Sequence, residues 1–437
     1  MATSDRYGFL HGTGGPALEC FAEATHAIVS YRPHALPALD RALAAQPGLG
    51  AAHALRGLLH VLPARPELMR DAALAQAMAH AAGAATADEA ALLQALDLAV
   101  AGRQRAAADV LDLRLERHPT VLLLVKLSNM LRFMSGDLAG LVGGVARVLP
   151  AWTPGTPGYG YVLGCHAFAL EESGDYAGAE RLGRDALDRA PDDAWSVHAV
   201  AHAHEMTRRA GAGAAWLEAV RPAWTGCAGF GFHVAWHLAL FHLERGDHVR
   251  VLALYDQEVR PAPTEDVRDV ANAVSLLWRL RQEGVAVGRR WDELAAIARR
   301  RRGETELLFG TLHNLLALLA AGDLPAAEAL VDAVADEAAG DRDQSAVARW
   351  AGLPLARALL ALARRQAPPP GLDRLARQLQ PLGGSHAQRD VWVRTLAGAA
   401  AGAGNLEALA GIRAARRALR GRDRFDAMLD ASRGEAA

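Results

Sequence analysis

Histidines occur with helical spacing at two places in the sequence. His198, His202 and Glu205 stand at positions i, i+4 and i+7, which places their side chains along one face of a helix. His233 and His237 repeat the i, i+4 spacing, and the steps from 198 to 233 and from 202 to 237 are both 35 residues. Imidazoles and a carboxylate gathered in this way act as metal ligands or as acid–base groups.

Three interpretations of this histidine set are open. In the first, His198, His202, His233 and His237 hold zinc or iron, and Glu205 is a further ligand or a carboxylate that orients one. In the second, no metal is bound and the same side chains are catalytic, as bases or hydrogen-bond donors. In the third, they form a buried polar network that only fixes the fold. The H-E-x-x-H motif of zinc metalloproteases is absent, because Glu205 does not lie between two histidines at that spacing.

A second polar run, from Gly383 to Asp390, adds further candidates. Gly-Gly-Ser before a helical segment predicts a helix N-terminus whose backbone N–H groups suit an anion. We expect Asp390 to serve catalysis by positioning a substrate together with Arg389, although these two residues could equally form a local salt bridge. The side chains expected to contact a ligand are Trp195, Met206, Trp236, His313, His386, Gln388 and Arg389.

The residue types predict that helices position these side chains. Ala, Leu, Arg and Glu, which favour helices, are abundant, whereas the β-branched and aromatic residues that favour strands are sparse. Only the leucine-rich segment 111–127 resembles a strand. Gly and Pro separate helical stretches of about ten to fifteen residues, so we expect an all-α protein of about twenty antiparallel helices.

The segment 160–193 matches the helix–turn–helix pattern of a tetratricopeptide repeat, which is about 34 residues long. Its Gly174-Asp175 turn recurs as Gly-Asp at 136–137, 246–247 and 322–323. Because one such helix pair cannot bury its apolar face alone, the pairs are expected to stack into an α-solenoid. We expect an N-terminal helical region (1–100), a solenoid continuous with it (101–430) and a short tail (431–437).

The position of the histidines within the repeat points to the inner face of the solenoid. Tetratricopeptide repeats contact ligands mainly through five positions of the first helix of each repeat, on the concave face. If that helix starts at Ala194, these five positions are Trp195, His198, His202, Glu205 and Met206. The histidine set is therefore expected to line a concave groove.

The overall composition narrows the classes of function. The 437 residues carry a net charge of −2, which gives no electrostatic footprint for nucleic acid. The three cysteines are too scattered for a disulfide framework or a cysteine-based zinc site.

The N-terminus lacks the features of a signal peptide, and the apolar stretch 307–321 is too short for a membrane span. We expect a cytoplasmic protein without membrane contact. Lys126 is the single lysine of the chain, and such a preference for arginine over lysine is typical of a GC-rich bacterial genome.

Taken together, these segments resemble the tetratricopeptide repeat protein 38 family over roughly residues 100–400. The most distinctive segment is His202-x-His204-Glu205-Met206. The other matching segments are 152–154, 193–198, 236–237, 246, 255–256, 283–285, 290–291, 352–354, 383–385 and 388–390. Ala235 departs from the aromatic residue expected before Trp236. The resemblance implies an α-solenoid with polar and aromatic groups gathered at a pocket, and it implies no particular reaction.

Two functions from different classes follow. In the first, the groove forms a pocket lined by His, Glu, Trp and Asp that binds a small molecule or a peptide and carries out acid–base or metal-assisted chemistry. The alternative is a non-enzymatic scaffold whose groove binds a partner protein. Scaffold grooves commonly use Lys, Arg or Asn to hold peptide carboxylates, so a groove with His, Glu and Trp favours the first function.

Overall fold

A computed structural model describes residues 2–434. Within this range the structure is helical apart from one short antiparallel pair, β1 (Thr3–Ser4) and β2 (Leu10–His11). The expected all-α class is therefore confirmed. The leucine-rich segment 111–127, which resembled a strand, lies in helices α6 (Gln104–Arg117) and α7 (Leu122–Met134) and the turn between them. Residues 431–434 of the expected tail continue the last helix, and 435–437 lie outside the described residues.

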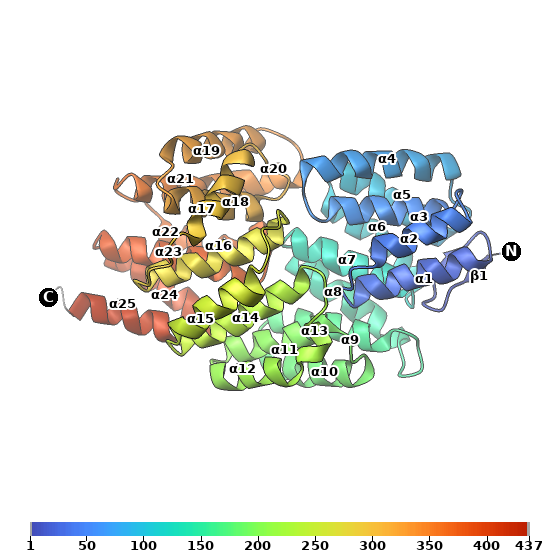
Figure 1. Cartoon of the computed structure of the whole chain (residues 1–437), viewed down its shortest axis with the longest axis horizontal. Coiled ribbons are helices and arrows are strands. Elements are labelled where there is room, and N and C mark those ends of the chain that lie inside the picture. Colours follow the sequence, from blue (N-terminus) through green and yellow to red (C-terminus); the bar gives the residue numbers. More distant parts are fainter. Residues whose placement is uncertain (1, 435–437) are drawn as a thin grey trace. The chain divides into compact units, whose positions relative to one another are not determined.

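The chain forms two compact units, whose helices are labelled in Figure 1. The first comprises Met1–Val200 and Val220–Gly231, and the second comprises Ala201–Ala219 and Phe232–Ala437. The expected region 1–100 lies in the first unit together with the beginning of the expected solenoid. Helix α11 (Ala194–Met206) runs through the boundary, and α14 (Phe230–Glu244) begins at it.

The other helices of the first unit are α1 (Pro16–Val29), α2 (Ala35–Ala45), α3 (Gly50–Val61), α4 (Pro66–Ala82), α5 (Ala87–Val100), α6 (Gln104–Arg117), α7 (Leu122–Met134), α8 (Leu138–Val148), η1 (Leu149–Ala151), α9 (Tyr159–Glu172), α10 (Tyr176–Arg189) and α13 (Arg221–Trp224). Those of the second unit are α12 (Ala210–Ala219), α15 (His248–Leu254), η2 (Tyr255–Val259), α16 (Val267–Gln282), α17 (Arg290–Arg300), α18 (Leu308–Ala320), α19 (Leu324–Ala338), α20 (Asp343–Val347), η3 (Ala348–Gly352), α21 (Leu353–Ala363), α22 (Leu372–Arg377), η4 (Gln380–Leu382), α23 (His386–Gly402), α24 (Leu406–Arg420) and α25 (Arg424–Gly434).

The four predicted Gly-Asp turns each join two successive helices. Each glycine has a φ between 64° and 93°, a left-handed conformation that ends a helix. Each aspartate caps the next helix, because its side chain accepts a hydrogen bond from the backbone N–H three residues further on. The joined pairs are α7 and α8, α9 and α10, α14 and α15, and α18 and α19, and Gly404-Asn405 joins α23 to α24 in the same way.

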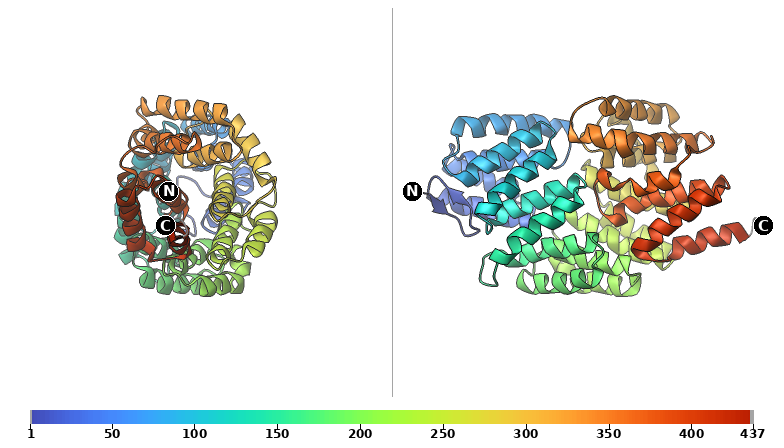
Figure 2. Two further views of the ribbon diagram at one scale, coloured as in Figure 1. Left: turned by 90° about the vertical axis from the view of Figure 1, so that its left-hand side faces the viewer. Right: turned by 180° about the vertical axis from the view of Figure 1, so that it is seen from behind.

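Successive helices pack against each other within each unit, and the antiparallel pairs can be followed in two further views in Figure 2. Small residues allow a close approach at several crossings. A Cβ atom added at Gly183 of α10 would lie 2.6 Å from the Val200 side chain of α11, and one at Gly310 of α18 would collide with Val267 of α16. The crossings therefore require glycine at these positions.

In the second unit, α16 and α23 are the helices around which the candidate site is built. α16 packs against α17, α18 and α23, and α23 packs against α22, α24 and α25. A row of polar side chains on α16 faces this interior: Asn272, Ser275 and Arg279 are all buried. The second unit therefore has a polar interior as well as an apolar one.

One continuous helical stretch in the described range, Asp343–Ala363, is long and apolar enough to cross a membrane by length and composition. It consists of α20, η3 and α21, and its most apolar window has a mean hydropathy of 1.3. Half of that window is buried within the structure. Core helices of folded domains share these features, so the stretch by itself is weak evidence for a membrane span.

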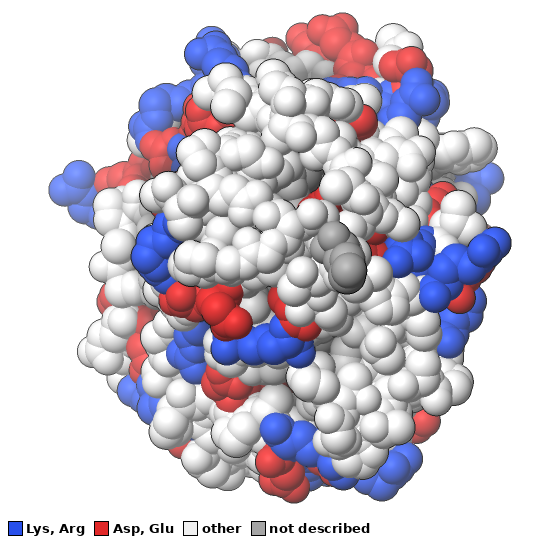
Figure 3. Space-filling view, turned by 90° about the vertical axis from the view of Figure 1, so that its right-hand side faces the viewer, with Lys and Arg blue, Asp and Glu red and all other residues white. Residues whose placement is uncertain are grey.

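The charged side chains on the face shown in Figure 3 are of both signs. Basic side chains, which are arginines because the single lysine is buried, are interspersed there with aspartate and glutamate among uncharged residues. This face therefore has no broad area of a single sign, as the small net charge of the chain leads one to expect.

Candidate metal centre

Helices α11 and α14 bring three histidines of the second unit together. His202 of α11 and His233 and His237 of α14 are all buried. The centroid of the His237 ring lies 4.4 Å from that of His202 and 4.8 Å from that of His233. Each imidazole offers one ring nitrogen, and these nitrogens lie within 4.8 Å of one another. The 35-residue step from His202 to His237 thus corresponds to a contact between two helices.

Two of these imidazoles are held in a defined tautomer by groups that accept hydrogen bonds. Nδ1 of His237 lies 3.1 Å from a carboxylate oxygen of Glu205, and Nδ1 of His233 lies 2.9 Å from the side-chain oxygen of Asn272. Because neither oxygen can donate a proton, the ring proton of each histidine belongs on Nδ1. The Nε2 atom of each ring then keeps the lone pair with which a neutral histidine binds a metal.

The surroundings keep the same two histidines neutral. Burial, together with the neighbouring imidazole of His237, lowers the pKa of His233 well below its ordinary value. Burial and the neighbouring His202 lower the pKa of His237 in the same direction. Both rings are therefore unprotonated near neutral pH, the state that metal coordination and general-base catalysis both require.

Glu205 supports the histidines rather than facing them as a further donor. One carboxylate oxygen accepts the hydrogen bond from His237, and the other lies 3.5 Å from Nη1 of Arg420. Both oxygens are therefore engaged, and the side chain is only 7% exposed. Of the two roles predicted from the sequence, ligand or orienting carboxylate, these contacts match the second.

Helix α16 fixes the other side of α14. Trp236 stacks on His233 with ring centroids 5.3 Å apart, and its Nε1–H donates to the hydroxyl of Ser275 at 3.0 Å. Asn272 on the same helix holds His233. Trp236 was expected to contact a ligand, and the structure places it as a support for His233. Asn272 and Ser275 were missed, although their spacing of three residues in an apolar helix was a signal.

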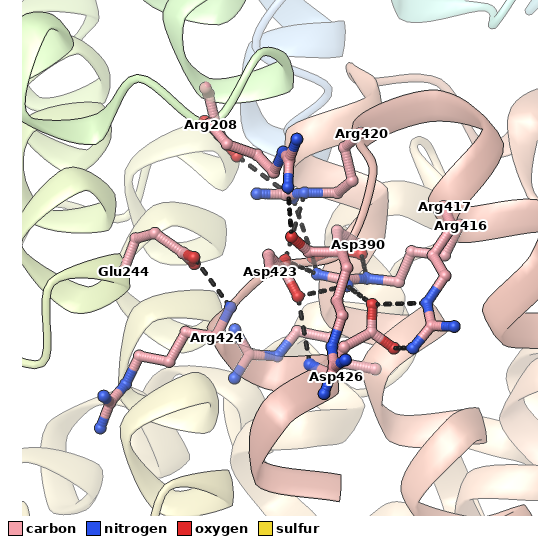
Figure 4. A network of polar contacts seen from close by, with 12 residues as sticks. Arg208, Glu244, Asp390, Arg416, Arg417, Arg420, Asp423, Arg424 and Asp426 are labelled. Atoms are coloured by element: carbon pink, nitrogen blue, oxygen red, sulfur yellow. Dashed lines mark hydrogen bonds and ion pairs between the residues drawn. The ribbon is translucent and has the colours of Figure 1, made fainter. Parts of the chain in front are cut away.

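Asp390 lies in an ion-pair network of the C-terminal helices, drawn in Figure 4. Its carboxylate accepts two hydrogen bonds from Arg416, at 2.7 and 3.0 Å, and one from Arg420 at 3.2 Å. Arg416 also contacts Asp423. Burial alone would raise the pKa of Asp390, but the guanidinium groups of Arg416 and Arg420 hold it well below its ordinary value. Asp390 is therefore a permanent anion that fixes two arginines.

The segment before Asp390 forms a helix cap, as its sequence predicted. The hydroxyl of Ser385 accepts from the backbone N–H of Gln388, and the Gln388 side chain accepts from the backbone N–H of Ser385 at 2.9 Å. Arg389 donates to the carbonyl oxygens of Gly383 and Gly384, and one of its nitrogens lies 3.2 Å from Nδ1 of His386. The contacts of Gln388, Arg389 and His386 therefore build the loop.

Two further candidates, His313 and Met206, are buried in the second unit. Nδ1 of His313 donates to the carbonyl oxygen of Phe309 at 2.7 Å, and its ring lies 4.7 Å from that of Trp392. Burial lowers the pKa of His313 to about 3. His313 is thus a neutral histidine held by its own helix, while Met206 ends α11 as an apolar side chain.

Trp195 and His198 lie in the first unit, in a cluster of aromatic rings. The ring of His198 lies 4.9 Å from that of Trp195 and 5.3 Å from those of Phe168 and Phe230. His198 stands one turn before His202 on the continuous helix α11, so the i, i+4 spacing keeps the two on one helix face. Both side chains are completely buried.

The donor set fits a first-row transition metal. Imidazole nitrogen is the ligand that zinc, iron and copper share, and a carboxylate bonded to the outer nitrogen is the usual support of a metal-bound histidine. A tetrahedral zinc with Zn–N bonds of about 2.0–2.1 Å needs nitrogens about 3.3 Å apart. The three nitrogens lie within 4.8 Å of one another, so the histidines could hold a metal ion.

Comparison with known families does not assign the chain. A scan against protein-family models finds no model that matches. Inferences about function therefore rest on the residues and the geometry given above.

Proposed function

We propose that the protein is a metalloprotein that binds zinc or iron through His202, His233 and His237. Glu205 orients His237. The observation that carries the proposal is the pair of Nδ1 hydrogen bonds, from His237 to Glu205 and from His233 to Asn272. These hydrogen bonds place the ring proton on Nδ1 and the lone pair on Nε2, which is the tautomer in which a supported histidine binds a metal.

We infer that the metal would serve chemistry on a small molecule. Zinc bound by histidines supplies a Lewis acid and lowers the pKa of a coordinated water, and iron in such surroundings supplies redox chemistry. The chain's own residues would hold the ring tautomers through Glu205 and Asn272 and would exclude bulk water, since all three histidines are buried. A metal-free site with His237 as the base is the alternative, and Glu205 would then stabilise its protonated form.

The fold supports a further part of the proposal. Four Gly-Asp turns that join antiparallel helices, with the same glycine conformation and the same aspartate cap, favour a solenoid of tetratricopeptide-like repeats. The resemblance to the tetratricopeptide repeat protein 38 family is consistent with this and remains a proposal. In this arrangement the first helices of neighbouring repeats, α11 and α14, supply the ligands.

One observation favours the scaffold alternative. The second unit has an open groove of about 430 Å³ between α16, α19 and α21, lined mainly by apolar side chains. Trp278, Leu324 and Leu362 lie along it, and Thr395 at its wall accepts a hydrogen bond from Trp278. A peptide or an apolar molecule would fit such a groove. A scaffold of this kind needs no metal, so metal content separates the two functions.

The test is elemental analysis of freshly purified protein kept free of chelators. We expect about one zinc or iron per chain, and a loss of at least ten-fold in metal content for His237→Ala, since each ligand contributes strongly to affinity. His242→Ala is the matched control, because His242 lies on the same helix but contacts Asp247 at the end of α14.

A second measurement covers the case in which the protein loses its metal during purification. Cobalt added to metal-free protein should give the visible absorption of a nitrogen-ligated site, and His233→Ala should abolish it while circular dichroism shows an unchanged helix content. Protein that contains no metal above background and binds no cobalt would contradict the metalloprotein and leave the metal-free base or the scaffold.

A further inference from the structure

A small polar cavity lies inside the second unit, behind Glu205. Its volume is about 30 Å³, which is the space for one or two water molecules or one carboxylate group. Four arginines and four acidic residues line it, with four mainly apolar side chains. The lining residues are Glu205, Arg208, Ala210, Leu240, Phe241, Leu243, Glu244, Arg279, Asp390, Arg394, Arg420 and Asp423.

One of these arginines is buried without a carboxylate partner among the described residues. Arg279 is 2% exposed, and its guanidinium group donates only to the backbone carbonyl oxygens of Ser275, at 3.2 Å, and Ala387, at 2.7 Å. It also lies 5.4 Å from the centre of the Trp236 ring. Burial lowers the pKa of Arg279 to about 9, so the group is still charged at neutral pH. The carboxylates of Asp390 and Glu205 attract Arg279 from the same cavity wall, but neither forms an ion pair with it among the described residues. An anion bound beside Arg279 would therefore add the direct charge-assisted contact that it lacks.

The other arginines of the cavity differ from Arg279 in this respect. Arg420 contacts Glu205, Asp390 and Asp423, and Arg394 contacts Glu283 at 3.1 Å. The Nε atom of Arg394 is nevertheless buried without a hydrogen-bond partner in the described range. Two guanidinium groups on the cavity wall therefore have capacity that the protein's own carboxylates do not use.

Arg208, the remaining arginine of the cavity lining, ends helix α11 in a left-handed conformation. Arg208 is exposed and has a φ of 61°, a left-handed conformation that glycine normally takes at the end of a helix such as α11. Its guanidinium group donates to the carbonyl oxygen of Arg422 at 2.9 Å, and the residue is drawn beside the network in Figure 4.

We propose that this cavity binds the carboxylate group of a small organic acid, with Arg279 as its principal partner and Arg394 as the second donor. Arginine is the side chain whose planar fork matches a carboxylate, and a volume of about 30 Å³ suits one small polar group. The cavity shares Glu205 with the candidate metal centre, so the acid would be held next to it. The carboxylate site stands whether or not the histidines hold a metal.

The experiment is an NMR titration of the purified full chain with ¹³C-labelled formate, in which line broadening reports binding. We expect saturable binding to the wild type, weakened at least ten-fold in Arg279→Met, because a charge-assisted hydrogen bond is lost. Arg281→Met is the matched control: Arg281 lies on the same helix, is exposed and is not part of the cavity lining, so its loss should leave the dissociation constant unchanged.

A second variant keeps the test decisive if Arg279→Met folds poorly. Ala210→Leu fills the cavity without changing any charge, and it should abolish formate binding while circular dichroism stays unchanged.

No saturable binding to the wild type, or formate bound equally by both variants, would overturn the proposal. In particular, formate that bound a metal ion instead of the cavity would survive Arg279→Met. Metal content measured on the same samples separates failure of this site from failure of the metal centre.

Discussion

In the second unit the buried cation Arg416 contacts the carboxylates of Asp390 and Asp423, whereas in the first unit the buried cation Lys126 lies among aromatic rings. Nζ of Lys126 is 4.5 Å from the centre of the Tyr31 ring and 4.8 Å from that of Trp195. No ion pair to Lys126 is present in the part of the chain that the structure describes.

The anions of the two interiors differ in the same way. Asp390 has arginine partners that keep it ionised, and its pKa is depressed. Asp193 of the first unit is 1% exposed and accepts a hydrogen bond from the backbone of Trp195, but burial raises its pKa to about 7. Helical hairpins of one kind thus surround Asp390 with paired arginines, whereas Asp193 has the attraction of Lys126 but no ion pair among the described residues. Arg132 of the first unit, like Arg416, is paired with carboxylates, those of Asp112 and Asp137. The comparison teaches that the pairing, not the burial, decides whether a buried carboxylate stays charged.

The strongest test of this contrast is Arg416→Met. The change leaves Asp390 and Asp423 buried without their main partner, and we expect the free energy of unfolding to fall by about 3–5 kcal/mol. Urea unfolding measures this loss. Arg377→Met is the control in the same unit, since Arg377 and Asp373 form a half-exposed pair that contributes less than about 1 kcal/mol. A loss below 1 kcal/mol for Arg416→Met would show that the network contributes nothing by pairing.

The next effect is a pH dependence that belongs to the first unit. The pKa of Asp193 is raised in the folded state, to about 7, above an unfolded value of about 3.9. Its contribution to stability is therefore fully present below about pH 4 and is lost as the pH rises through 7, by about 1.4 kcal/mol per pH unit at most.

Asp193→Asn removes this titration. Urea unfolding should show that the free energy of unfolding of the variant, relative to that of the wild type, rises by about 3 kcal/mol between pH 4 and pH 8. Other titrating groups affect both proteins equally and cancel in the difference. If the free energies of unfolding of the two proteins changed in parallel with pH, Asp193 would have a charged partner as effective as those of Asp390. The contrast between the two aspartates would then fail.

The smallest effect is expected for Lys126→Met. The change removes contacts of a cation with two aromatic rings, which contribute about 1–2 kcal/mol, and it also removes the cost of burying a charge without a carboxylate partner. The two nearly cancel, so the free energy of unfolding should stay within about 1 kcal/mol of the wild type. A loss above 3 kcal/mol in urea unfolding would place Lys126 in a network as tightly paired as that of Arg416.

Much of the local structure could be predicted from residue types. Each Gly-Asp turn was recognisable because glycine tolerates the left-handed conformation and aspartate caps a helix, and the Ser385–Gln388 cap followed from the same chemistry. The contact between His202 and His237 could be inferred from a 35-residue step, because helices of neighbouring repeats pack side by side. These are properties of short segments and of a repeat length.

The partners of the candidate residues could not be predicted. Asn272 and Ser275 are each 39 residues away from the histidine or tryptophan that they hold. Their spacing marks one face of α16, but nothing in α14 indicates that this face meets it. Asp390 was expected beside a substrate, yet two arginines of α24 contact it. Surface and interior arginines look alike in a sequence that uses arginine almost exclusively for positive charge.

The sequence by itself determined which helices form, where they turn, and that two of them carry histidines on one face, because these depend on spacing and on local hydrogen bonds. The tertiary structure decided which nitrogen of His233 and His237 keeps its lone pair, which carboxylates are paired, and that Arg279 is buried with only carbonyl partners. Charge state and tautomer depend on groups brought close from distant parts of the chain and on the exclusion of water. For that reason the chemistry of this interior could be argued only after the helices were in place.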